Sequence, residues 1–201
     1  MSHPRCGVRS GFLVLALLVL ASTAGAQQQP AIEFEDPDLP AREKEYFQRW
    51  STTVRAWAMV QRVVAEVRER NAEPLTPDRV REIDAAWRAG RDPDNLRKKL
   101  TSNPCALALQ SVLSSHTSVS EIFVTDARGA LVCATGSPPA FDEAGEARFQ
   151  KAMAEGRGAI FVSRARAGES AGGAEVVQVS VPVLDGGRAV GVLTVVKLVG
   201  G

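Results

Sequence analysis

Apolar residues recur with two different spacings along the chain, and the change between them separates a helical part from a sheet part. Over residues 41–70 apolar positions such as Phe47, Val54 and Trp57 fall three or four apart, with charged residues between them. This spacing puts the apolar side chains on one face of a helix. It predicts one long amphipathic helix over 41–70, whose apolar face packs either on its own domain or against the same helix of a second copy.

Three shorter helices are predicted next, each with the same start signal: a side chain that can cap a helix, followed by proline. The signals are Thr76-Pro77, Asp92-Pro93 and Asn103-Pro104. The predicted helices lie near 77–89, 93–100 and 104–115.

After residue 120 apolar and polar residues alternate, which is typical of strands. Turn signals at Ala127-Arg128-Gly129 and Asp185-Gly186 join two pairs of strands. A helix over 143–155, capped by Asp142, follows the second strand. The predicted strands span 121–126, 130–135, 159–165, 174–184 and 188–198. The pattern predicts an α+β fold, with the long N-terminal helix and the short helices packed on one face of a five-stranded, mostly antiparallel sheet.

The N-terminus has the pattern of a secretory signal peptide. Residues 1–10 contain two arginines and no acid, and an unbroken apolar run over 12–21 follows. That run is shorter than the roughly 20 residues of a transmembrane helix, and it leads to the small residues Ala24-Gly25-Ala26. We expect a signal peptide over 1–26, cleavage after Ala26 and a periplasmic or secreted protein. The alternative is an uncleaved anchor.

The remaining 175 residues suit one domain. Residues 27–40 are polar and rich in proline, and we expect a flexible leader there. The domain itself is predicted over 41–201, with its helical part at 41–115 and its sheet part at 121–199. Loss of the signal peptide changes the formal charge from +1 to −1, so nothing in the charge favours nucleic acid as a partner.

Two cysteines remain after the predicted cleavage, Cys105 in a predicted helix and Cys133 in a predicted strand. In an oxidising compartment such a pair can form a disulfide. The alternative is two buried thiols that never meet.

The residue types that catalysis and metal binding require are sparse. The mature chain has one histidine, His116, and no G-x-S-x-G nucleophile motif. One histidine and two separated cysteines lack the spacing of a zinc site. We therefore expect a protein that is not an enzyme and has no metal site or cofactor.

Residues 121–199 resemble the extracytoplasmic sensor domains called Cache or PDC domains, which are built on a PAS-like sheet. The resemblance rests on four segments in order: EIFVTDARGALVCAT, GEARFQKAM, AIFVSRARAGESAGGA and VVQVSVPVLDGGRAVGVLTVVKLV. It covers about 80 residues of the mature chain. It implies a pocket on one face of the sheet, roofed by the helix between the second and third strands, for a small polar molecule such as an amino acid, carboxylate, amine or purine.

Amino-acid-binding members of that family resemble one another in an R-x-W-Y-x-x-A helix motif. Alignment of its alanine on Ala152 puts Phe149 at the tyrosine, Arg148 at the tryptophan and Glu146 at the arginine. The arginine that clamps a carboxylate is therefore missing in register.

Six residues are candidates to line such a pocket. Arg148 and Lys151 on the roof helix can grip a carboxylate or phosphate, or they can face solvent. Two polar residues of the fourth strand point to the face beneath that helix, or to a solvated outer face. Two phenylalanines are expected as pocket wall or core. The candidates are Arg148, Phe149, Lys151, Phe161, Gln178 and Ser180.

The relatives implied by the resemblance are usually joined to a membrane helix and a signalling module. The sequence after residue 26 has no second long apolar segment. We therefore expect a ligand-binding sensor domain that acts through a membrane receptor or transporter. The alternative is a ligand-free interaction module that forms a homodimer through residues 41–70.

Overall fold

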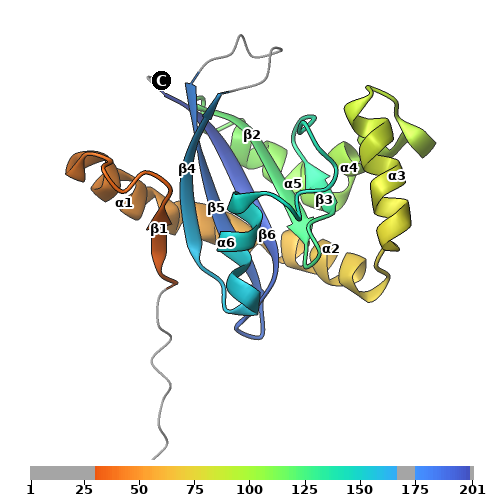
Figure 1. Ribbon diagram of the computed structural model, residues 1–201, viewed down its shortest axis with the longest axis horizontal. Helices are drawn as coiled ribbons and strands as arrows, with labels where there is room; N and C mark the ends of the chain where they lie inside the picture. Colours follow the sequence, from red (N-terminus) through yellow and green to blue (C-terminus); the bar gives the residue numbers. More distant parts are fainter. Residues whose placement is uncertain (1–29, 167–174, 200–201) are drawn as a thin grey trace, which may run out of the picture.

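The computed structural model describes residues 30–166 and 175–199 (Figure 1). The predicted signal peptide, its cleavage site after Ala26 and the glycine-rich segment 168–173 lie outside these residues. No helix in the described ranges is both long enough and apolar enough to cross a membrane.

The strands form one six-stranded sheet in the order β1-β4-β5-β6-β2-β3. Neighbouring strands are antiparallel, except that β1 and β4 are parallel. The strands are β1 (Ile32–Phe34), β2 (Val119–Asp126), β3 (Leu131–Ala134), β4 (Ile160–Arg166), β5 (Glu175–Asp185) and β6 (Arg188–Leu198). The predicted α+β class and all five predicted strands are confirmed, and β1 is a sixth.

Strand β1 lies in the segment 27–40 that the sequence predicts as a flexible leader, so that prediction is wrong from residue 30 onward. Ile32 pairs with Ile160 and Phe34 with Val162, which adds β1 to the edge of the sheet. Ile32 and Phe34 pack against the main core while the side chain between them is exposed. A three-residue strand is too short for its alternation to stand out from a polar, proline-rich sequence.

The predicted single helix over 41–70 is two helices, α1 (Ala41–Ala58) and α2 (Gln61–Ala72). Met59 ends the first helix, and Val60 has φ −57° and ψ 128°, a backbone conformation outside the helical region. The interruption contains neither proline nor glycine, so no local signal marks it.

Packing explains the interruption. Val54 and Ala58 are fully buried in α1, and a continuous helix would next bury positions 61, 62 and 65. The buried residues of α2 are instead Val63 and Val67. The break turns the apolar face of α2 in a different direction from that of α1. Helix α1 packs along β5, while α2 contacts α5 and β2.

The three short helices follow the prediction with one correction. Helix α3 (Pro77–Arg88) and helix α5 (Pro104–Leu113) begin at the predicted prolines, and Thr76 and Asn103 cap them. The segment predicted as a helix over 93–100 instead starts with a 3-10 turn, and helix α4 (Leu96–Ser102) begins after it. Asp92 still acts as a cap, because its Oδ1 accepts a hydrogen bond from the Arg97 N–H at 2.8 Å.

Helix α6 (Ala147–Met153) is shorter than the helix predicted over 143–155. Asp142 does not cap it; its Oδ1 accepts a hydrogen bond from the Ala144 N–H at 3.0 Å, and the Glu143 N–H donates to the Gly129 carbonyl at 2.9 Å. These bonds hold the residues before α6 in a turn against the β2–β3 connection, so the helix starts four residues late.

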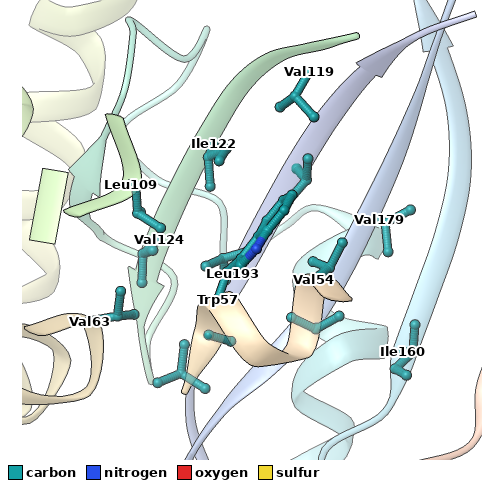
Figure 2. Packing of buried hydrophobic residues seen from close by; sticks show 14 of the residues in the cluster. Val54, Trp57, Val63, Leu109, Val119, Ile122, Val124, Ile160, Val179 and Leu193 are labelled. Carbon is teal, nitrogen blue, oxygen red and sulfur yellow. The ribbon is translucent and has the colours of Figure 1, made fainter. Parts of the chain in front are cut away.

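Helices cover both faces of the sheet, not one face as predicted (Figure 1). The main core lies between one face and α1, α2 and α5, where Val54 and Trp57 meet Val179 and Leu193 (Figure 2). Helix α6 packs on the opposite face, against β4, β5 and β6. A second apolar cluster joins α3 and α4 to Phe123 and neighbouring residues.

Cys105 of α5 and Cys133 of β3 form a disulfide, with their Cα atoms 6.0 Å apart. Both residues are fully buried in the main core. The bond ties the helical part of the chain to the edge of the sheet.

Candidate ligand-binding site

Strand β5 has one apolar and one partly polar face, as its alternation predicts. Its valines at 177, 179, 181 and 183 lie in the main core. Gln178 and Ser180 therefore point to the face that α6 covers, since successive strand residues face opposite sides. The antiparallel register with β4 places Ser163 opposite Gln178 and Phe161 opposite Ser180.

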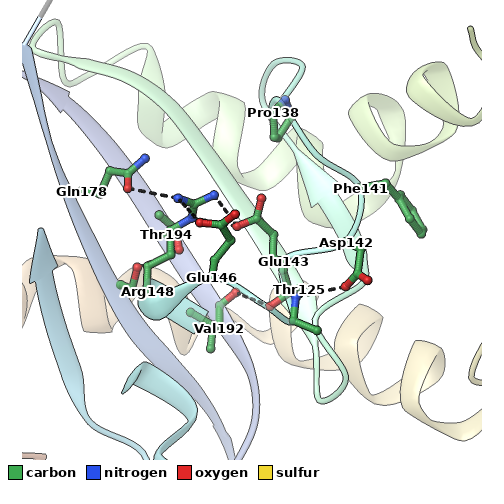
Figure 3. Close-up of polar contacts among 12 residues, drawn as sticks. Thr125, Pro138, Phe141, Asp142, Glu143, Glu146, Arg148, Gln178, Val192 and Thr194 are labelled. Carbon is green, nitrogen blue, oxygen red and sulfur yellow. Dashed lines mark hydrogen bonds and ion pairs between the residues drawn. The ribbon is translucent and has the colours of Figure 1, made fainter. Parts of the chain in front are cut away.

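Helix α6 turns Arg148 toward this polar face (Figure 3). The Arg148 Nη1 donates a hydrogen bond to the Gln178 Oε1 at 3.4 Å. The guanidinium also lies 5.9 Å from the ring centroid of Phe123 on β2, a cation–π distance. The structure thus brings together two of the predicted site residues, Arg148 and Gln178.

Arg148 is held mainly by a carboxylate that precedes its helix. Its Nε and Nη2 both reach the Glu143 Oε2, at 2.7 and 2.6 Å, and its Nη1 lies 3.4 Å from the Glu146 Oε2. The side chain of Glu143 is 1% exposed and that of Arg148 is 15% exposed. Glu121, Glu143, Glu146, Arg148 and Gln178 are called the Arg148 cluster below.

The other oxygen of Glu143 has no partner. Its Oε1 is buried and makes no hydrogen bond to the described residues. Burial raises the pKa of Glu143, and the charge of Arg148 only partly opposes that rise. Buried polar atoms almost always have a hydrogen-bond partner. The Glu143 Oε1 is therefore an unusual buried acceptor that the described residues leave unused.

The loop that carries Glu143 is fixed by α3. The Asp84 Oδ1 accepts hydrogen bonds from the Phe141 N–H at 2.9 Å and the Asp142 N–H at 3.1 Å. The Trp87 Nε1 donates to the Pro138 carbonyl at 2.7 Å. These contacts join a helix far away in the sequence to the turn beside α6 and hold Glu143 over the sheet.

Glu121 adds a second carboxylate on the same sheet face. Burial and the charge of Glu143 raise its pKa from 4.5 to about 7, although Arg148 acts in the opposite direction. The cluster therefore holds three carboxylates and a single arginine, and one carboxylate titrates near neutral pH.

The raised pKa of Glu121 predicts that the domain becomes less stable as the pH rises from 5 to 8. The folded state favours the protonated carboxyl, so the stabilisation is complete below pH 4.5 and is lost as the pH passes 7. The shift corresponds to roughly 3 kcal/mol. Urea unfolding at several pH values measures the slope. It should become shallower in Glu121→Gln and persist in Glu45→Gln, whose carboxylate is exposed; an unchanged slope in Glu121→Gln would contradict the prediction.

The other four candidates are distributed around the cluster. Ser180 is buried and shares a hydrogen bond of 2.9 Å with Thr194 of β6. Phe149 packs with Ala152 and Val192, and Phe161 is buried beside Ser180 in the register. Lys151 is half exposed and forms an ion pair with Glu33 of β1, so it points away from the cluster.

Sequence reasoning missed Glu121, Glu143 and Glu146. Acidic residues at the end of a strand or before a helix are mostly exposed, so their presence carries no signal by itself. Glu143 becomes a site residue only because the contacts from α3 and Gly129 bury it.

An open groove of about 380 Å³ lies on the opposite face of the sheet, beside α1. Its charged lining includes Arg164, which forms ion pairs with Glu43 and Glu175. Its apolar lining includes Tyr46 and Phe47 of α1. None of the six predicted site residues borders this groove. Within the described ranges, no group of three or more histidine, cysteine or acidic residues could hold a metal ion.

Two solved structures resemble the chain in part. One is the ligand-binding domain of the Pseudomonas aeruginosa amino-acid chemoreceptor PctC in complex with GABA, with 17% identity, a TM-score of 0.37 and coverage of 61% of each chain. The other is the sensor domain of the Vibrio cholerae histidine kinase DctB, with 12% identity and a TM-score of 0.31, covering 79% of this chain and 58% of that one.

The chain therefore spans about three fifths of the length of each of these two structures. By their names both are ligand-binding or sensor domains, the class of protein that the sequence resemblance implies. At these TM-scores the likeness adds no argument to those that the chain's own residues carry. No protein-family model matches the sequence, and no curated protein does.

Proposed function

We propose that this chain is an extracytoplasmic sensor domain of the Cache type that binds a small polar molecule between α6 and the sheet. The observation that carries the proposal is the buried pair of Arg148 and Glu143, whose Oε1 has no hydrogen-bond partner among the residues that the structure describes. A buried ion pair is costly and adds little stability unless its remaining atoms are satisfied. Groups with perturbed pKa values that converge on one face are typical of a binding site.

The proposed role is recognition without catalysis. The cluster contains carboxylates, a guanidinium and an amide, but no nucleophile paired with a base. Export follows from the predicted signal peptide, and the disulfide suits an oxidising compartment. The bound state would be communicated to a membrane receptor or transporter, the partner expected from the resemblance.

A thermal-shift screen of the purified protein against small amino acids, amines, carboxylates and purines tests the proposal. A ligand present at a hundred times its Kd should stabilise the folded state by about 2.7 kcal/mol, which is a rise in Tm of roughly 5–10 °C. The shift should be lost in Gln178→Leu, which lacks the amide beneath α6, and kept in Gln48→Leu on the exposed side of α1. If no compound in the screen shifts Tm, the proposal fails.

The alternative is a dimerisation module that works through residues 41–70. Most apolar side chains of α1 and α2 are used inside the domain, among them Val54 and Val67. Tyr46 and Met59 remain 42% and 66% exposed, and Tyr46 borders the open groove. These two exposed side chains are the surface that such a dimer would use.

We expect the protein to be a monomer in sedimentation equilibrium at micromolar concentration, because two exposed apolar side chains bury too little area for a stable dimer. Tyr46→Glu should sediment in the same way as the unchanged protein. A dimer that Tyr46→Glu dissociates would favour the alternative.

A further inference from the structure

The Arg148 cluster contains more carboxylates than its one arginine can neutralise. Two carboxylates, those of Glu143 and Glu146, pair with one guanidinium. Glu121 makes no ion pair within the described ranges, and the surroundings of both Glu143 and Glu121 raise their pKa values. Arg88, the other arginine whose charge affects Glu143, is itself paired with Asp84. The cluster is therefore short of positive charge.

Most N–H donors of Arg148 are already engaged. Its Nε and Nη2 are bound to the Glu143 Oε2, and its Nη1 faces Glu146 and Gln178. A ligand carboxylate could accept only the second N–H of Nη2 without displacing one of these acceptors, and there it would lie beside the carboxylates of Glu143 and Glu146. A ligand that donates hydrogen bonds has an acceptor available, because both contacts of Arg148 with Glu143 go to the Oε2 and leave the buried Oε1 without a partner among the described residues.

From these contacts, and resting on the proposed function, we infer that the site recognises an ammonium group of its ligand, which donates to the Glu143 Oε1 and is neutralised jointly by Glu143 and Glu121. An ammonium has three donors and no acceptor, so it suits a cluster rich in carboxylate oxygens. Such charge-assisted hydrogen bonds are about twice as strong as neutral ones.

The inference predicts how binding depends on pH. Glu121 is ionised only above its raised pKa, so an ammonium ligand should bind roughly tenfold more tightly at pH 8 than at pH 6. The charges that act on Glu121 are those of Glu143 in the loop before α6 and Arg148 of α6. Glu143 also has a raised pKa, which changes affinity in the same direction, while the arginine stays charged. A ligand bound through its carboxylate would show the opposite dependence.

Three four-carbon probes separate the possibilities: putrescine with two ammonium groups, succinate with two carboxylates, and uncharged 1,4-butanediol. We expect calorimetry and thermal shift at constant ionic strength to show putrescine binding, more tightly at pH 8 than at pH 6. Binding should fall at least tenfold in Glu143→Gln and in Glu121→Gln. It should be unchanged in Glu155→Gln, a matched variant whose carboxylate is 83% exposed in its ion pair with Arg157.

The outcomes distinguish this inference from the proposed function. Succinate binding without putrescine binding would overturn the inference and leave a small-ligand sensor in place. Putrescine binding that survives both glutamate substitutions would also overturn it. If none of the probes binds while another compound of the broad screen does, the ammonium inference fails alone; if nothing in the screen binds, the proposed function fails with it. Glu121→Gln keeps the test valid should Glu143→Gln fold poorly, since Glu121 makes no ion pair within the described ranges.

Discussion

Replacement of Arg148 with methionine should lower the free energy of unfolding by about 3–5 kcal/mol, because it leaves the carboxylate of Glu143 buried without a counter-charge. Glu143 is 1% exposed, so water cannot compensate for the lost guanidinium. The loss should be larger at high pH than at low pH, because protonation of Glu143, whose pKa burial raises, removes the unpaired charge. Urea unfolding monitored by circular dichroism measures it.

The double variant Arg148→Met/Glu143→Gln is the decisive comparison. Removal of both charges should recover part of the lost stability, because a buried neutral amide costs less than a buried carboxylate without a counter-charge. Arg157→Met is the matched control, since that arginine is 73% exposed and should contribute less than 0.5 kcal/mol, about the limit for surface positions. If the double variant is as unstable as the single one, Arg148 stabilises the domain through its packing and not through its charge.

Removal of the disulfide should cost about 3–4 kcal/mol. Cys105 and Cys133 are 28 residues apart in the sequence, and closing a loop of this length restricts the unfolded chain by roughly that amount. The variant Cys105→Ala/Cys133→Ala keeps two small apolar side chains in the core, so the change mainly reports the cross-link. Guanidinium unfolding of the variant and of the unchanged protein gives the difference.

A reductant provides the control for this prediction. Dithiothreitol should lower the stability of the unchanged protein toward that of the alanine variant and leave the variant unaffected. Equal stability of the two proteins under oxidising conditions would mean that the bond does not form in solution.

The sheet was predictable from sequence because its signals are local. Alternating valines and the Asp185-Gly186 turn define β5 and β6 within one residue of their observed bounds. The side of β5 on which Gln178 lies also follows from alternation alone. The proline start signals likewise fix the first residues of α3 and α5.

The features that sequence reasoning missed depend on contacts between distant segments. The interruption at Met59 and Val60 exists because α1 and α2 pack on different elements. No residue type at these positions predicts it. Glu143 is four residues before α6, where an acidic residue ordinarily faces solvent. Its burial requires Asp84, 59 positions earlier, to hold the loop. A single sequence does not contain that information in any local pattern.

Strand β1 also covers part of one edge of the sheet. It occupies the edge of β4 over Ile160 to Val162, where unpaired backbone groups would otherwise be available to a strand of another chain. A chain shortened to residue 41, the domain boundary that the sequence suggests, would uncover that edge. Three residues of an apparently irregular segment thus keep part of the β4 edge from pairing with a strand of another chain.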